Sequence, residues 1–346
     1  MTGSAEGAQD FVARLQIGQQ AAEIYCEGEV IDLHVESFIW TRVFGYDLTR
    51  EHGHGLLGAR YYSQVDFPRM LRTGLAGSVM SIATNPFRFA RTQTLAKNTR
   101  RLKQIIEDAP GVQLVQSASD YRAARAAGNH ACFIGLQGGN AIARSEQIEA
   151  LDPAVTRVTV VHLTNSNYGR TSSPFSKFSR RADLSDEGCE LIAALNQRKV
   201  MVDLSHISRL GFWRAIEAHD NTLPPIVSHT GVCGVKKSWR NIDDEQIRAI
   251  AARGGVVGVI YHIGFLGGRR VAAVAAHLDH LLRVGGEDLP ALGSDWDGMI
   301  TTPRDMKTVC ELPRLVQALL DLGWSRQQIS KTLGKNYLRV LAAVRP

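Results

Sequence analysis

Short apolar segments recur along the chain, and most of them end at a polar residue able to bind or polarise a ligand. Each segment is seven to nine residues long, and the apolar run within it suits a strand buried on both faces of a parallel sheet. We expect eight strands at residues 28–35, 76–84, 131–137, 155–163, 199–206, 224–230, 254–262 and 289–296.

Helical periodicity separates most of these strands. Residues 94–108, 184–199 and 243–255 carry apolar side chains at three- and four-residue spacing. Ser185 and Asp243 stand where N-terminal caps are expected for the second and third helices. Eight β units with helices between them predict an α/β fold of the (β/α)8 TIM-barrel type.

The 346 residues show no linker that would divide them and no internal repeat. We therefore expect a single barrel domain over residues 1–346, with residues 1–25 forming an N-terminal extension or helix. Two long segments lack periodicity, residues 38–62 after the first strand and residues 165–183 after the fourth. Because the second follows a strand end, we expect it to form a loop over the site.

Composition narrows the classes of function. Apolar residues make up 44% and charged residues 21%, as in globular proteins, and the net charge of +6 comes from dispersed Lys and Arg such as Arg100 and Arg101. No nucleic-acid motif, secretory signal or apolar run of about 20 residues is present, so we expect neither a nucleic-acid nor a membrane partner. Five dispersed cysteines without CxxC spacing indicate reduced thiols and a cytoplasmic location.

Metal-ligand residue types stand at successive strand ends. Residues i and i+2 of a strand share a face, so His34 and Glu36 are expected to reach the same ion. Imidazole nitrogens and carboxylate oxygens suit zinc. By contrast, His52 and His54 lie in a glycine-rich segment away from any strand end, and we interpret them as parts of a polar loop. The strand-end residues are His34, Glu36, Gln137, His162, His206, His229 and Asp295.

Eight pieces of the sequence, in order, resemble the membrane dipeptidase (renal dipeptidase-like) family of zinc peptidases. They are DLHVE, GLQGG, VTVVHLTNSN, VDLSHIS, VSHTGV, WRNIDDEQIRAIAARGGVVGV, GSDWDG and LGKNYLRVL, and they extend from about Asp32 to Val340. The resemblance implies a barrel with two adjacent Zn2+ ions that hydrolyses dipeptides or similar small amides. The family's tendency to form dimers makes a homodimer a further expectation.

The resemblance also implies roles for individual residues. His34 and Asp295 match the ligands of one metal, and His206 and His229 match those of the other. His162 matches a histidine that contacts the substrate and steadies the developing oxyanion. Arg240 matches an arginine that binds the terminal carboxylate of the substrate, and Asp295 is the candidate for proton transfer to the leaving amine.

Two positions depart from the family pattern. Glu36 stands where the family has Asp, which keeps the ligand type on a longer arm. Gln137 stands where the family has a Glu that bridges both metals. A carboxylate offers two anionic oxygens, whereas an amide offers one neutral carbonyl oxygen and an NH2 group that repels a cation. The repulsion between two dications is then less compensated, so the second ion is doubtful.

Three functions fit this departure. The first is a zinc hydrolase with altered metal use, holding one tight ion and one weak or absent ion. The second is a binding or scaffold protein that kept the barrel and lost the chemistry. The third is an enzyme recruited to another amide-like substrate in a biosynthetic pathway. The retention of the other site residues argues against simple decay, and we rank the hydrolase first. Those residues are His34, His162, His206, His229, Arg240 and Asp295.

Three further polar residues have ordinary structural interpretations. Asp203 either orients a ligating histidine or hydrogen-bonds to a neighbouring loop. Asp297 is expected to bind backbone amides in its turn, and His262 is expected to be a hydrogen-bonded histidine at the barrel mouth.

Overall fold

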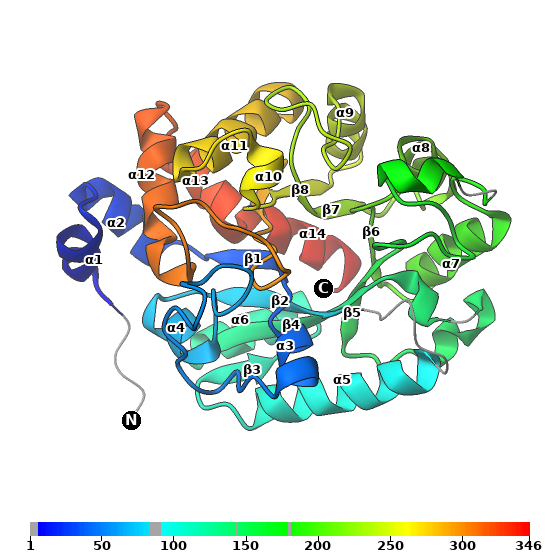
Figure 1. Cartoon of the computed structure of the whole chain (residues 1–346), viewed down its shortest axis with the longest axis horizontal. Coiled ribbons are helices and arrows are strands. Elements are labelled where there is room, and N and C mark those ends of the chain that lie inside the picture. The colour runs from blue at the N-terminus through cyan, green and yellow to red at the C-terminus, as the bar shows by residue number, and fades with distance from the viewer. Residues whose placement is uncertain (1–5, 84–90, 143, 179–180) are drawn as a thin grey trace.

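Eight parallel strands close into a barrel, and helices surround it (Figure 1). The computed structural model describes residues 6–83, 91–142, 144–178 and 181–346, so Thr84, the last residue of the second predicted strand, lies outside the described residues. The barrel closes where Asp32 pairs with Leu292. The predicted TIM barrel is therefore confirmed. Its strands are β1 (Ile31–Val35), β2 (Gly77–Ala83), β4 (His130–Gln137), β5 (Val155–Thr159), β6 (Met201–Asp203), β7 (Ile226–Thr230), β8 (Val256–Val259) and β9 (Pro290–Leu292).

One short strand was not predicted. β3 (Val112–Leu114) pairs with the first residues of β4, before β5 begins to pair with the same strand at Ile134. Its three residues carry no apolar run, and two of them are only half-buried. Such a segment has too little pattern to stand out in the sequence.

The predicted helices form with their expected caps. The hydroxyl of Ser185 accepts a hydrogen bond from the backbone N–H of Gly188, and Asp243 forms a capping box with Gln246. The segment 38–62, expected to be a loop, begins with a helix instead. The helices are α1 (Ala8–Leu15), α2 (Gln19–Glu27), α3 (Phe38–Phe44), α4 (Phe67–Arg72), α5 (Arg91–Glu107), α6 (Ala118–Ala126), α7 (Asp186–Gln197), α8 (Arg209–Ala218), α9 (Asp244–Ala252), α10 (Ile263–Leu266), α11 (Val271–Gly285), α12 (Pro313–Asp321), α13 (Arg326–Ser330) and α14 (Asn336–Val344).

Four strands end earlier than the apolar pattern suggested, and one of them is β8, which stops at Val259 instead of His262. β5, β6 and β9 each stop three residues before the expected site residue, which is His162, His206 and Asp295 respectively. His206 and Asp295 have φ angles of 66° and 62°, in the left-handed region that non-glycine residues rarely adopt. Such backbone ends a strand and redirects the side chain at the barrel mouth.

The C-terminal signature closes the opposite end of the barrel. Gly334 lies in a π-helical turn (Lys331–Lys335) that packs against β9 and β1. The side-chain amide of Asn336 donates to the carbonyl of Glu287, before β9, and to that of Pro290, the first residue of β9. Arg339 donates to backbone carbonyls that precede β8 and β9. The signature therefore ties together the starts of the strands whose other ends carry the candidate site.

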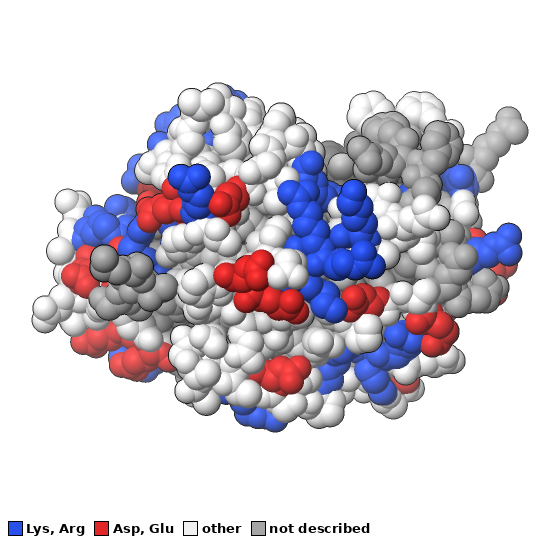
Figure 2. Space-filling model, turned by 90° about the horizontal axis from the view of Figure 1, so that it is seen from below, with Lys and Arg blue, Asp and Glu red and all other residues white. Residues whose placement is uncertain are grey.

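Basic side chains gather on the face seen from below (Figure 2), the side on which α5 lies in Figure 1. On α5, Lys97, Arg100 and Arg101 are exposed. The Arg100–Arg101 cluster is thus a solvated helix face, as expected. Within the described residues, no helix combines the length and the apolar content needed to cross a membrane.

The close packing at Gly334 can be tested by mutation. A Cβ atom at this position would lie 1.8 Å from the carbonyl oxygen of Glu29. Because a backbone atom must move, Gly334→Ala should lower the free energy of unfolding by about 1–3 kcal/mol or more in urea titrations. Gly7→Ala is the matched control, since its Cβ would lie an ordinary 3.7 Å from Asp10. Equal losses in the two variants would contradict the packing argument.

Candidate active site

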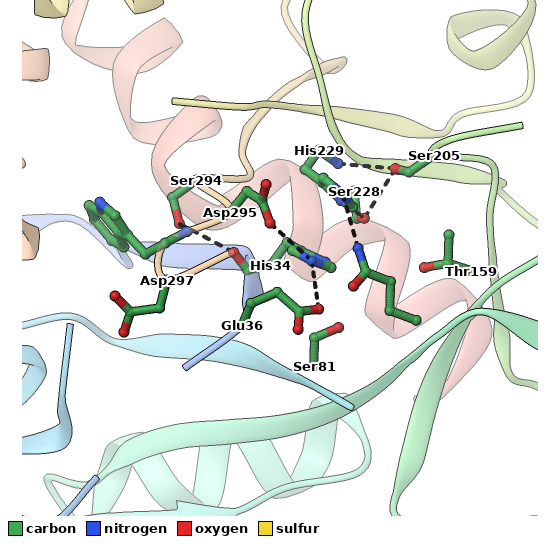
Figure 3. Close-up of polar contacts among 12 residues, drawn as sticks. His34, Glu36, Ser81, Thr159, Ser205, Ser228, His229, Ser294, Asp295 and Asp297 are labelled. Atoms are coloured by element: carbon green, nitrogen blue, oxygen red, sulfur yellow. Dashed lines mark hydrogen bonds and ion pairs between the residues drawn. The ribbon is translucent and has the colours of Figure 1, made fainter. Parts of the chain in front are cut away.

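A histidine and two carboxylates converge at the mouth of the barrel. The Nε2 atom of His34 lies 3.1 Å from Oε1 of Glu36 and 3.5 Å from Oδ1 of Asp295. Figure 3 shows His34 between the two carboxylates, with β1 supplying one side and the segment after β9 the other. All three side chains are buried. Two acids and an imidazole in one buried place form a donor set for a cation.

Four more of the predicted site residues lie beside this group. The Nε2 atoms of His206 and His229 are 2.8 Å apart, and the amide nitrogen of Gln137 lies 3.5 and 3.3 Å from them. The ring of His162 meets that of His206 edge to face, with centroids 4.8 Å apart. Every strand-end residue singled out in the sequence thus has a neighbour from the same set.

The two groups form one centre. The rings of His34 and His229 stack with their centroids 3.7 Å apart. Ligand atoms of His34, His229 and Asp295 all lie within 4.8 Å of one another, and this is the metal-type cluster found among the described residues. The resemblance assigned His34 and His229 to different metals. Their proximity shows that residues from both assigned sites can approach a single position.

The electrostatics of this centre favour a bound cation. Burial raises the pKa of Glu36, and burial together with the neighbouring Glu36 raises the pKa of Asp295 well above its ordinary value. Burial also lowers the pKa of His34 and His229, so both imidazoles are neutral near pH 7. Buried carboxylates that repel each other, beside neutral imidazole nitrogens, fit a divalent metal.

A polar relay orients His229. The hydroxyl of Ser228 donates to Oδ2 of Asp203 at 2.6 Å and lies 2.8 Å from Nδ1 of His229. Because that hydroxyl proton is used on Asp203, Nδ1 of His229 must carry the hydrogen and donate to Ser228. The lone pair of Nε2 is then left facing the centre. Of the two interpretations open for Asp203, the structure supports the orientation of a histidine.

The same tautomer argument shows how the position assigned to a second metal, at His206 and His229, differs from the position at His34 and Asp295. With a lone pair on Nε2 of His229, the 2.8 Å contact requires a hydrogen on Nε2 of His206. Two nitrogens bound to one tetrahedral zinc, at about 2.0–2.1 Å each, would lie about 3.3 Å apart. The Gln137 amide nitrogen also faces both rings. His206 thus donates to His229, and the Gln137 amide beside them supplies no anionic oxygen, so this group lacks the negative charge that a second cation needs.

Arg157 is a buried residue of the site that the sequence reasoning missed. Its guanidinium donates to the carbonyl of Leu33 at 2.9 Å and to the hydroxyl of Ser81 at 3.0 Å, and it lies 3.5 Å from Asp203. Gly135 provides the space for this guanidinium, since a Cβ atom at position 135 would lie 2.5 Å from Nη2 of Arg157. The available signal was an arginine inside an otherwise uncharged strand, which requires a buried partner.

Asp32 holds together the two chain segments that carry Glu36 and Asp295. Its Oδ1 accepts from the backbone N–H of His34 at 2.9 Å and of Ser294 at 3.1 Å. It thereby links β1 to the segment that carries Asp295. Burial raises the pKa of Asp32 to about 6.

Other polar residues near the mouth have structural roles. Asp297 accepts from the hydroxyl of Ser37 and from the backbone N–H of Gln64, so it joins two loops and does not bind amides of its own turn. His262 accepts from the N–H of Thr301 at 3.1 Å, as expected for a satisfied histidine. His52 bonds to a carbonyl within its own loop and lies outside the metal-type cluster.

Arg240 lies against the backbone of the histidine group. Its Nη2 donates to the carbonyl of His229 at 2.7 Å, and the side chain is buried. Burial lowers the pKa of Arg240 to about 10, so it stays charged near pH 7. Within the described residues it has no salt bridge, which leaves its positive charge available to an anionic ligand.

The relay to His229 predicts a metal-binding phenotype. Ser228→Ala should weaken zinc binding about 10- to 100-fold, because His229 loses the partner that keeps its hydrogen on Nδ1 and its Nε2 lone pair able to turn from His206 to the ion. Ser78→Ala is the matched control, since Ser78 is equally buried and lies 2.8 Å from Nε2 of His130, a histidine outside the site. Zinc titration of both metal-free variants measures the effect. Equal affinities would remove the relay from the account.

Comparison with known proteins identifies the family of the chain. Residues 18–346 match the family model described as "Membrane dipeptidase (Peptidase family M19)". A Klebsiella pneumoniae protein named "Uncharacterized protein in pqqA 5'region" is 39% identical over 168 residues, which cover 46% of this chain and 61% of that protein. "Dipeptidase 3" of Rattus norvegicus is 27% identical over 68% of this chain and 49% of its own length. The chain thus spans between about half and three fifths of these relatives.

Solved structures share the fold. The probable dipeptidase PvdM from Pseudomonas aeruginosa has a TM-score of 0.82 and 18% identity, covering 94% of this chain and 98% of that one. A Rhodobacter sphaeroides metallopeptidase, solved with a phosphinate mimic of L-Ala-D-Ala, has a TM-score of 0.76 and 23% identity, covering 91% and 99%. The family match across nearly the whole chain confirms the resemblance read from its motifs: the chain belongs to Peptidase family M19, the membrane dipeptidase family.

Proposed function

We propose that this protein is a zinc-dependent hydrolase of dipeptides or similar small amides that uses a single tightly bound metal ion. The observation that carries the proposal is the buried cluster of His34, His229 and Asp295, whose ligand atoms lie within 4.8 Å of one another, with Glu36 3.1 Å from His34. Membership of a metallopeptidase family supports the same chemistry. We further propose a cytosolic, single-domain protein, since none of its five cysteines forms a disulfide.

The metal position follows from the donor set. His34, Glu36 and Asp295 would hold the ion, with His229 as the neighbouring imidazole. A Zn2+ ion in a peptidase polarises the scissile carbonyl and lowers the pKa of water. Asp295 is the most exposed of these three ligands, so it is the candidate for proton transfer to the leaving amine.

Two residues would position the substrate. Arg240 carries a charge with no salt bridge in the described chain, and its planar fork matches a carboxylate. His162 is half-buried beside His206, and burial lowers its pKa to about 4. As a neutral imidazole it can donate one hydrogen bond to a carbonyl oxygen that gains negative charge.

Gln137 supports the single-ion version of this proposal. Its amide nitrogen faces the imidazole nitrogens of His206 and His229, the place that the family resemblance gives to a second ion. The same lack of a bridging carboxylate also favours the alternative, a dipeptidase-like binding protein or an enzyme recruited to another amide. Zinc content together with turnover on a dipeptide panel separates them. Zinc with turnover supports the hydrolase, zinc without turnover supports recruitment, and an empty site supports the binding protein.

Gln137→Glu should restore a second metal ion. The new carboxylate adds a negative charge and a bridging oxygen between the histidine group and the His34 group. Zinc bound per chain, measured by titration of the metal-free protein, should rise from one to two, and dipeptide hydrolysis should rise with it. Gln113→Glu, on β3 away from the site, is the matched control and should stay at one. A wild type that already binds two ions tightly would contradict the proposal.

Arg240→Lys should weaken binding of a dipeptide with a free carboxylate, because an ammonium group cannot form the paired hydrogen bonds of a guanidinium. We expect KM to rise about tenfold or more, equivalent to about 1.4 kcal/mol, with zinc content unchanged. A dipeptide amide should show no such difference. Arg214→Lys, on an exposed part of α8, is the control. Equal KM values for Arg240→Lys and wild type would rule out this role.

A further inference from the structure

A cavity of about 610 Å3 opens on the outside of the barrel, where the ring of helices is incomplete. Among the described residues, β4 is the barrel strand that leads to the next strand without an α-helix, through two 3-10 turns, η1 (Gly139–Ala141) and η2 (Ser145–Ala150). The turn η1 packs against α5, and η2 packs against α7. The cavity lies among these elements, and its volume is in the roughly 300–1,000 Å3 range of small-molecule sites.

The inner wall of this cavity is apolar. Leu95 of α5, Ile142 and Leu151 line it, and all three belong to the hydrophobic core. The side of α5 that faces the cavity also carries the small side chains of Thr92 and Ala96. Because Ala96 is exposed, the wall is open from outside, and a hydrocarbon group that enters would remove apolar surface from water.

The rim of the cavity carries one positive charge more than its ion pairs use. Lys103 pairs with Asp152 at 3.2 Å, and Arg198 pairs with Glu149 at 2.7 Å. Arg100 also lines the cavity, is exposed, and has no ion-pair partner within the described chain. The Nε atom of Arg198 is buried without a hydrogen-bond partner among the described residues. Both guanidinium groups therefore keep N–H donors from which an anion can accept.

The charges of the rim fit a carboxylate better than a phosphate. A carboxylate brings one negative charge, which the excess positive charge of Arg100 balances. A phosphate group carries about two negative charges near pH 7 and would also meet the carboxylates of Glu149 and Asp152. An apolar wall below a rim with one excess cation therefore indicates an amphipathic monoanion.

We propose that this cavity is a second ligand site, separate from the barrel mouth, for a small carboxylate with a hydrocarbon tail, of the kind of a medium-chain fatty acid. The tail lies against Leu95, Ile142 and Leu151, and the carboxylate binds Arg100 at the rim. The lining residues include none of the candidate metal or substrate residues, so the site stands independently of the proposed hydrolase.

Calorimetric titration of the zinc-loaded protein with octanoate tests the site. Octanoate should bind at least about tenfold more tightly than butyrate, whose tail is shorter by four methylene groups. It should also bind at least about tenfold more tightly than octylammonium, which has the same tail and the opposite charge. No binding of octanoate, or equal affinities for the three probes, would overturn the proposal.

Variants on α5 show where octanoate binds. Ala96→Trp places a large ring in the cavity from an exposed position, and Arg100→Gln removes the unpaired charge. Each should weaken octanoate binding about tenfold or more with zinc content unchanged. Ala123→Trp on α6 and Lys97→Gln on α5 change exposed residues that do not line the cavity and should bind octanoate as the wild type does.

The same variants separate this site from the barrel mouth. Octanoate binding that is unchanged by both Ala96→Trp and Arg100→Gln would place the ligand elsewhere, for example at the zinc ion, and would contradict the proposal. Binding that both variants weaken, in a protein without dipeptide turnover, would support the cavity assignment while contradicting the proposed hydrolase.

Discussion

The site depends on a charged group buried inside the barrel. Arg157 projects from β5 and contacts β1 through the carbonyl of Leu33, β2 through Ser81 and β6 through Asp203. Burial works to raise the pKa of Asp203, but Arg157 and the hydroxyls of Ser228 and Thr159 outweigh it, so the carboxylate stays ionised. Removing one partner would leave an uncompensated buried charge, which costs about 3–5 kcal/mol. The pair therefore fixes four strands just beneath the candidate metal ligands.

From this pair the constraint passes to the chemistry. Asp203 accepts a hydrogen bond from the hydroxyl of Ser228, and Ser228 accepts one from Nδ1 of His229. The Nε2 lone pair of His229 therefore faces the centre. That lone pair in turn requires a hydrogen on His206 and leaves Gln137 beside both rings. The buried carboxylate of Asp203 thus makes the two positions differ. The position at His34 and Asp295 suits a cation, whereas a hydrogen bond fills the position between His206 and His229. The exchange of a bridging acid for an amide changes the site without disturbing the barrel.

The fold and the candidate site residues could be predicted from the sequence, because each strand is marked by an apolar run and each candidate residue stands at the end of such a run. A buried strand is an apolar run, and His34, Gln137 and His229 lie within such runs. The left-handed backbone at His206 and Asp295 could not be predicted, since it depends on where the strand stops. β3 and Arg157 were missed for different reasons. β3 is too short to show a period, and the partners of Arg157 come from distant parts of the chain that only the closed barrel brings together.

The central claim is that one metal position exists among His34, Glu36 and Asp295, and that hydrogen bonds fill the second. Anomalous scattering at the zinc edge from crystals of the zinc-loaded protein tests this most directly. The account predicts one peak within bonding distance of His34, Glu36 and Asp295, and no peak between His206 and His229. Two peaks about 3.5–4 Å apart, the spacing of paired metals in hydrolases, would contradict it. So would a single peak elsewhere, for example at His52 and His54.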